Sequence, residues 1–245
     1  MTDPGYVARV LVWFSCGAAS AMAAKLISQT VTNRSVEYLY CDTLKYEHPD
    51  NMRFLHDVEK WIGHEIKMLN PADYNGGYTD IFDVFDRRKY LVGIHGAQCT
   101  VLLKKVVREK YSNPDDIHVI GYTKGEEHRA ARFTEVNFEV LTRFILIEKG
   151  ITKRRCLFEL QAAGIELPVM YQLGYKNNNC IGCVKGGMGY WNKIRQDFPE
   201  AFERMAKQER KMQATILNGQ YLDELEPGKG NYHGEKNLSC GLFCG

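Results

Sequence analysis

The stretch from Val10 to Ser28 constrains the fold most, because three kinds of sequence follow one another in it without a gap. Residues 10–14 are a continuous β-branched and aromatic run, which is typical of a strand buried on both faces of a parallel sheet. Residues 15–20 have only small side chains, and the alanine-rich residues 21–28 predict a helix. The fold is therefore expected to begin with a strand, a tight loop and a helix.

The small side chains of residues 15–20 would let a ligand approach the backbone. The N–H groups that open the following helix lack backbone acceptors, and the helix dipole favours an anion beside them. The loop is neither the Gly-x-x-x-x-Gly-Lys-Ser/Thr loop nor Gly-x-Gly-x-x-Gly, so no standard phosphate-binding motif decides its role. An anion site and an ordinary strand-to-helix turn both fit this stretch.

Apolar runs alternate with helical patterns along the chain, and they predict an α/β fold with a doubly wound, mostly parallel sheet. The expected strands are residues 10–14, 36–41, 65–69 and 117–121. Ligands bind such sheets beyond the carboxyl ends of the strands, an edge that would gather residues 15–20, Asp42 with Thr43, and residues 121–132. An acidic residue in the place of Asp42 often holds a ribose, although a helix cap or loop carboxylate is the commoner role.

The length and the helical patterns bound the domain organisation. A chain of 245 residues can bury one large core, or one core with a smaller lobe. We expect a nucleotide-binding α/β domain over residues 1–170 and a cysteine-rich helical region over residues 171–245 that packs on it. The second region is expected to contain one long helix, residues 190–212, and a polar, mobile tail beyond Asn218.

Composition places the chain among globular proteins. Hydrophobic residues make up 44% and charged residues 25%, the balance of a soluble domain, and a net charge of +2 argues neither for nor against nucleic acid as a partner. No apolar run is long enough to cross a bilayer, and the polar N-terminus does not resemble a signal peptide. We therefore expect a cytoplasmic protein with no membrane partner.

Eight cysteines in a reducing compartment point to metal or redox chemistry rather than to structural disulfides. Cys180 and Cys183 form a C-x-x-C pair, which supplies only two metal ligands. Cys99 and Cys156 open predicted helices, where a thiolate is stabilised, and they are our candidates for the other two. Four thiolates suit an iron–sulfur cluster or zinc. The alternative is that Cys99 and Cys156 are small buried hydrophobes and that Cys180 and Cys183 are a redox dithiol.

Taken together, these pieces resemble the phosphoadenosine phosphosulfate (PAPS) reductase family of the adenine nucleotide alpha-hydrolase superfamily, whose phosphate loop is a modified PP-loop. The resemblance extends over roughly residues 10–244 and is closest to the small members common in phages and mobile elements. It rests on residues 15–20, Cys41-Asp42-Thr43 with Glu47-His48-Pro49, Cys99-Thr100 with Lys104, Gly121-Tyr122 with Glu126, Glu127 and Arg129, Cys156, residues 179–183, and Cys240-Gly241-Leu242.

The resemblance implies a Rossmann-like sheet that holds an adenine nucleotide over its carboxyl edge. The loop that cradles phosphate or sulfate groups is matched by Ser15, Gly17, Ala18 and Ser20. Asp42 and Thr43 would lie beside the adenosine, and Gly121 is expected at the same site. The cations that would hold the anionic groups are Lys104, Arg129 and Arg132.

The resemblance also implies a 4Fe-4S cluster, with zinc as the alternative. In assimilatory adenylylsulfate reductases, a cysteine at a helix start and a later C-x-x-C bind such a cluster, and Cys99, Cys180 and Cys183 occupy those places. The adjacent cysteine pair of that group is missing, because Gln98 precedes Cys99. We infer that Cys156 supplies the fourth ligand.

Family reductases carry a C-terminal Glu-Cys-Gly-x-His, whose cysteine attacks the sulfur of the activated sulfate. This chain has Ser239-Cys240-Gly241-Leu242-Phe243-Cys244, so the cysteine and glycine agree while the glutamate and histidine are absent. Cys240 is the expected nucleophile, and Cys244 would resolve the intermediate as a disulfide. Both could instead be exposed tail thiols, or one could be a cluster ligand.

The first interpretation is therefore a PAPS reductase-like enzyme that forms a homo-oligomer and takes electrons from a thioredoxin- or glutaredoxin-type reductant. A second is ATP-dependent adenylation and sulfur transfer to a nucleic-acid or small-molecule acceptor. Ala19 argues against the second, because members that use ATP have aspartate there. A third is a non-catalytic nucleotide-binding module. Basic residues of the helix 190–212 alternate with acidic ones, which favours a solvated face over a nucleic-acid surface.

Overall fold

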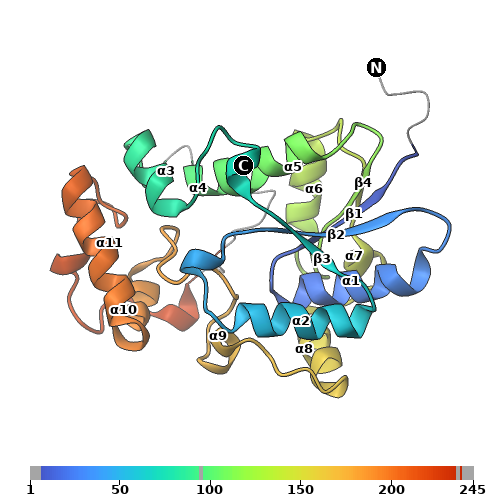
Figure 1. Cartoon of the computed structure of the whole chain (residues 1–245). Coiled ribbons are helices and arrows are strands. Elements are labelled where there is room, and N and C mark those ends of the chain that lie inside the picture. Colours follow the sequence, from blue (N-terminus) through green and yellow to red (C-terminus); the bar gives the residue numbers. More distant parts are fainter. Residues whose placement is uncertain (1–6, 94–95, 236–237, 239–245) are drawn as a thin grey trace. The chain divides into compact units, whose positions relative to one another are not determined.

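The computed structural model describes residues 7–93, 96–235 and 238 (Figure 1). Its chain divides into two compact units. Unit 1 consists of Met1–Asp42, Pro49–Asn70 and Val106–Asn178. Unit 2 consists of Thr43–His48, Pro71–Lys105 and Asn179–Gly245. This grouping does not test which segments fold alone, so the division expected at residue 170 stays a prediction.

Unit 1 is built on a five-stranded sheet whose strands are all parallel. The order is β3-β2-β1-β4-β5. The strands are β1 (Val10–Phe14), β2 (Val36–Cys41), β3 (Ile66–Leu69), β4 (Ile117–Val119) and β5 (Thr142–Arg143). The predicted parallel α/β sheet is confirmed, and β5 is an addition to the four expected strands. It has two half-buried residues at the sheet edge, so it lacks the apolar run by which the others were predicted.

The sheet is doubly wound. Helices α1 (Ala18–Thr30) and α2 (Asn51–Ile62) lie on one face, and α5 (Val106–Tyr111) and α6 (Glu127–Val136) lie on the other (Figure 1). From β1 the chain proceeds outward through β2 to β3 and then returns to β4 on the opposite side of β1. The strand order therefore reverses between β1 and β4. Three later helices, α7 (Ile145–Glu148), α8 (Lys153–Ala162) and α9 (Val169–Gln172), complete the unit.

The core of unit 1 lies between the central strand and its helices. All five residues of β1 are buried, which explains their unbroken apolar run. Ala21 and Ala24 of α1 are fully buried, and their short side chains let the helix backbone approach the sheet. On α2, Phe54, Leu55 and Val58 form the buried face. Each large side chain buried in this way stabilises the fold by about 1.5–3 kcal/mol relative to exposure.

Unit 2 is mainly helical. Its α-helices are α3 (Ile81–Arg88), α4 (Gln98–Thr100), α10 (Met188–Asp197) and α11 (Pro199–Met212), and α4 continues as a π-helical turn, η3 (Val101–Lys105). Its 3₁₀ turns are η1 (Leu44–Tyr46), η2 (Pro71–Asp73), η4 (Leu222–Glu224) and η5 (Tyr232–Gly234). The predicted single helix over residues 190–212 is wrong. Phe198 leaves the helical conformation at φ −141°, ψ 65°, and Pro199, which lacks an N–H, begins α11.

The expectation of a mobile tail beyond Asn218 is also wrong for residues 219–235. Leu222 and Leu225 are buried. The Glu209 carboxylate accepts a hydrogen bond from the Leu222 N–H at 2.6 Å, and the Glu235 carboxylate accepts one from the Gly189 N–H at 2.6 Å. The polar composition of the tail concealed these two anchors. Across the described residues, no helix combines the length and the apolar character needed to cross a membrane.

Candidate nucleotide site and cysteine loop

The loop after β1 is a tight turn held by its own serine hydroxyls. The Ser20 hydroxyl accepts hydrogen bonds from the Ser15 N–H at 3.1 Å and the Ser15 hydroxyl at 3.2 Å. It donates one to the Gly17 carbonyl at 2.9 Å. Gly17 is the N-cap of α1, and no side chain caps that end. The expected loop residues Ser15, Gly17, Ala18 and Ser20 therefore form one structural element at the start of the helix.

The chain after β4 lies directly against this helix start. A Cβ atom at Gly121 would be 2.9 Å from both the Cα and the amide nitrogen of Ser20, closer than real Cβ contacts. Only glycine permits this approach. Gly121 and the first turn of α1 are thus neighbours at the point where the strand order reverses, as the sequence predicts. Doubly wound sheets bind ligands at such a reversal.

Asp42 and Thr43 directly follow β2, so Asp42 lies at the carboxyl end of that strand. The Asp42 N–H donates to the Leu69 carbonyl at 2.9 Å, which continues the pairing of β2 with β3 by one residue. Thr43 belongs to unit 2, where its hydroxyl donates to the Glu47 carboxylate at 2.6 Å and both side chains are buried. The Thr43–Glu47 pair fixes the turn of residues 43–48.

The N-terminus of α6 carries an ion pair between Arg129 and Glu126. Burial opposes ionisation of Glu126, but hydrogen bonds from the Thr123 N–H at 3.0 Å and its hydroxyl at 2.8 Å, with the Arg129 charge, lower the pKa of that carboxyl. The Arg129 guanidinium lies 4.3 Å from the centre of the Tyr122 ring. Arg129 is therefore already paired. Arg132 is exposed on α6, and Lys104 lies in η3 of unit 2.

Three residues that were not predicted from the sequence as site residues lie around the loop after β1. The Tyr171 hydroxyl accepts a hydrogen bond from the Ala18 N–H at 3.3 Å, and burial raises the pKa of Tyr171 to about 12, so it stays neutral. The Asn178 side-chain amide donates to the Cys16 carbonyl and to the Asn51 side chain, both at 2.7 Å. Cys16 needs this support because its φ of 51° is left-handed, a conformation that few residues other than glycine adopt.

Lys153 is the third of these residues. Its ammonium donates to the Asn177 side-chain oxygen at 2.6 Å and to the Lys176 carbonyl, and it lies 5.5 Å from the centre of the Tyr171 ring. Burial lowers the pKa of Lys153, and the Glu126 charge opposes that shift. Its distance along the chain from residues 15–20 hid the connection. The available signal was a lysine in the first turn of a helix, where the dipole disfavours a cation.

Cys180 and Cys183 lie in a buried loop of unit 2. The Tyr190 hydroxyl accepts hydrogen bonds from the Gly182 N–H at 3.1 Å and the Cys183 N–H at 2.9 Å, and it donates to the Cys180 carbonyl at 3.2 Å. Gly182 has a φ of 81°, which turns the loop tightly between the two cysteines. A fixed loop with two thiols fits either two ligands of a metal site or a redox dithiol.

The other two candidate ligands have different surroundings. Cys99 lies on α4 and is partly exposed. Cys156, in the first turn of α8, has no exposed surface, and burial raises the pKa of its thiol to about 12. Cys156 belongs to unit 1 and the other three to unit 2. Among residues 7–93, 96–235 and 238, no group of three or more His, Cys, Asp and Glu side chains is placed to hold a metal ion. The four-cysteine site stays a prediction.

Cys240 and Cys244 lie outside the described residues. Leu238 is described, and its carbonyl accepts a hydrogen bond from the Asn179 side chain at 3.3 Å. Asn179 directly precedes Cys180, so the chain two residues before Cys240 lies beside the cysteine loop. The nucleophilic role of Cys240 stays a prediction.

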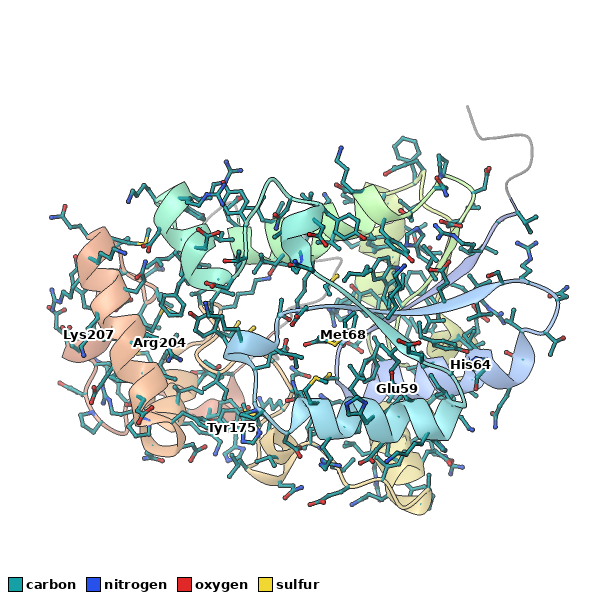
Figure 2. The ribbon with its side chains drawn as sticks, viewed as in Figure 1. Glu59, His64, Met68, Tyr175, Arg204 and Lys207 are labelled. Carbon is teal, nitrogen blue, oxygen red and sulfur yellow. The ribbon has the colours of Figure 1, made fainter. Side chains whose placement is uncertain are left out.

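A shallow groove of about 480 Å³ lies between α3 and α11 in unit 2. Phe82 lines one side of the groove. The charged face of α11, which includes Arg204 and Lys207 (Figure 2), lines the other. Two cations of α11 have ion-pair partners within the unit: Arg210 pairs with Asp223 at 2.8 Å, and Lys211 pairs with Asp86 at 2.7 Å. The expectation of a solvated face rather than a nucleic-acid surface stays a prediction.

No protein-family model matches this sequence, and no curated protein sequence matches it.

Proposed function

We propose that this protein binds the anionic part of an adenine nucleotide at the first turn of α1 and acts on it as a PAPS reductase-like enzyme. The observation that carries the proposal is the approach of Gly121 to the Ser20 backbone at the reversal between β1 and β4. A side chain at residue 121 would close that space, so glycine keeps the helix start and the adjacent strand end in contact.

The physical chemistry of the loop supports an anionic ligand. The first amide groups of a helix lack backbone acceptors, and the dipole of a 13-residue helix favours negative charge there. The first turn of α1 has no acidic residue that would compete with a ligand. Ser15 is exposed and carries a hydroxyl at the rim of the loop. A phosphate or sulfate group fits this combination of small side chains and N–H donors.

The reaction that we propose is reduction of adenylylsulfate, or its 3′-phosphate, to sulfite. The Cys240 thiolate attacks the sulfate sulfur, an S–S bond forms, and the bond from sulfur to the bridging phosphate oxygen breaks. The nucleoside phosphate leaves with that electron pair, and the enzyme carries a thiosulfonate. A dithiol reductant of the thioredoxin or glutaredoxin class then attacks the Cys240 sulfur. Sulfite leaves, and the second thiol of the reductant closes its disulfide and restores the Cys240 thiol.

A 4Fe-4S cluster, with zinc as the alternative, belongs to this proposal. Cys180 and Cys183 fit as two of its ligands, because Tyr190 fixes their loop and both thiols are buried. Cys99 and Cys156 would complete the set, and Cys156 must first lose a proton that burial holds tightly. Such a group would supply positive electrostatic potential to an anionic substrate.

The test uses protein purified anaerobically and incubated separately with adenylylsulfate, phosphoadenylylsulfate and ATP in the presence of thioredoxin. We expect sulfite and a nucleoside phosphate from one of the sulfonucleotides. Cys240→Ser should abolish both products, whereas Cys244→Ser, the matched control in the same tail, should still release the nucleotide. AMP and pyrophosphate from ATP, with no sulfite from any substrate, would overturn the reductase proposal in favour of adenylation.

A further inference from the structure

The start of α8 carries an unusual concentration of positive charge. Lys153, Arg154 and Arg155 are the first three residues of the helix, and its first turn has no acidic residue. The helix dipole already places partial positive charge at this end, so three cations there oppose helix stability. Arg155 pairs with Glu159, and Arg154 is exposed to solvent. Lys153 differs from both because it is partly buried within unit 1.

The hydrogen-bond acceptors of the Lys153 ammonium are both neutral. They are the Asn177 side-chain oxygen, at 2.6 Å, and the Lys176 carbonyl. Glu126 favours the charged form of Lys153 through space, but Arg129 disfavours it, and those two groups pair with each other. An ammonium has three donors, of which these contacts use two. Lys153 is therefore a partly desolvated cation with one donor to spare and no anion bonded to it among the described residues.

Its surroundings place this cation at the candidate nucleotide site. The Lys124 N–H donates to the Ile151 carbonyl at 2.8 Å, which ties the loop after β4 to the chain entering α8. The ammonium lies 5.5 Å from the centre of the Tyr171 ring, and the Tyr171 hydroxyl accepts the hydrogen bond of the Ala18 N–H. Lys153 therefore neighbours both the first turn of α1 and the first turn of α6.

We propose that Lys153 is an anion-binding residue of the nucleotide site, and that its ammonium donates its third hydrogen bond to a phosphate or sulfate oxygen of the ligand. The proposal rests on the function proposed above and assigns a specific cation to it. An anionic oxygen would neutralise a charge that the protein alone leaves without an ion pair, and it would also suit the α8 dipole. Arg129, one of the three cations that the family resemblance implies, would have to leave Glu126 to do the same.

The test compares AMP, adenosine and inorganic sulfate as probes of the full-length protein. Isothermal titration should show that Lys153→Gln weakens AMP binding roughly tenfold or more, since a hydrogen bond to a charged group is lost together with the charge. Adenosine, which lacks the anion, should bind as it does to the unchanged protein. Lys153→Arg should recover part of the AMP affinity. Lys149→Gln, which removes an exposed lysine nearby in the chain, is the matched control and should change neither ligand.

Each other outcome has a definite meaning. Equal AMP affinity in Lys153→Gln would overturn the Lys153 assignment and leave the nucleotide site standing. Equal loss of AMP and adenosine would overturn it too, because Lys153 would then only hold residues 176–177 in place. If the unchanged protein binds no adenine nucleotide, the proposed function fails. In that case, the melting temperature is measured with and without inorganic sulfate. If sulfate raises it in the unchanged protein but not in Lys153→Gln or Lys153→Met, Lys153 is still supported as an anion site. If sulfate also raises it in both variants, that role of Lys153 is excluded.

Discussion

The loop of residues 15–20 in unit 1 and the loop of residues 180–183 in unit 2 each precede a helix, but they are held in different ways. The first follows a central strand, and its shape comes from hydrogen bonds among Ser15, Gly17 and Ser20. The second has no strand before it, and the hydroxyl of Tyr190, a residue of the next helix, holds its backbone. The first loop is therefore held largely by its own side chains. The second is held by a side chain of the following helix together with the Ile181 N–H, which donates to the Tyr46 carbonyl at 2.8 Å.

The two loops also differ in what surrounds them. Around the first loop, β1 pairs with β4, and Gly121 after β4 lets the chain contact the start of α1 at Ser20. Around the second, the tail returns to the helix that follows it: a Cβ atom at Gly189 would lie 2.3 Å from the Tyr232 nitrogen. We therefore expect the first loop to be disturbed most by a change in the packing of Gly121 against Ser20, and the second to be sensitive to the loss of the Tyr190 hydroxyl.

The largest effect is expected from Gly121→Val. The new side chain would meet the Ser20 backbone at 2.9 Å, and backbone cannot move aside as a flexible side chain can. Overpacking of this kind should lower the free energy of unfolding by about 3 kcal/mol, measured by urea denaturation. Gly17→Ala is the control, because its Cβ would meet nothing closer than the Tyr171 hydroxyl at 3.5 Å. A Gly121→Val protein as stable as the control would show that Gly121 is not tightly packed against Ser20.

Acid should weaken the contact between β1 and β4. His118 on β4 accepts a hydrogen bond from the Trp13 indole of β1 at 2.9 Å, and burial, with Arg108 and Arg9 nearby, lowers the pKa of His118 to about 4. The unfolded chain has a histidine pKa of about 6.5, so it binds a proton first as the pH falls, and the native state loses stability below that pH. The loss should be about 2 kcal/mol at pH 5 and nearly absent at pH 7.

Urea denaturation at pH 7 and pH 5 measures this loss. His118→Gln should remove most of the difference between the two pH values, whatever it costs at pH 7. His128→Gln, which replaces an exposed histidine of α6, should keep the difference. A pH dependence that persists in His118→Gln would assign it to other groups.

The sequence predicted the parts of the molecule whose causes are local. The apolar run of β1 and the spacing of Phe54, Leu55 and Val58 on α2 each predict one element, and both elements are present. β5 was missed because two edge residues carry no pattern. The break before α11 was missed although Pro199 marks it, because the amphipathic pattern continues across the break.

The candidate site shows the same limit. Ser15, Gly17 and Ser20 were predicted because a run of small residues after a strand is a local signal, and Gly121 because the strand before it ends at the same edge of the sheet and because of the family resemblance. Tyr171 was missed because it contacts the loop through the N–H of Ala18, a residue 153 positions away in the chain. Lys153 was missed because it is connected to that loop through Tyr171, whose ring centre lies 5.5 Å from its ammonium. Arg129 was nominated for its charge, and sequence alone could not show that Glu126 already neutralises it.

The smallest effect, and the most direct test of the comparison, comes from removing one hydroxyl beside each loop. Tyr190→Phe removes the hydroxyl that bonds two buried N–H groups and the Cys180 carbonyl, and it should lower the free energy of unfolding by about 2 kcal/mol. Tyr171→Phe removes one acceptor from a loop that keeps its serine hydrogen bonds, and it should lower the free energy of unfolding by about 1 kcal/mol. The decisive measurement is the rate at which a thiol reagent labels Cys180 and Cys183, read by mass spectrometry. Labelling should accelerate in Tyr190→Phe and stay unchanged in Tyr171→Phe. Equal labelling in both variants would show that the tail, rather than Tyr190, holds the cysteine loop.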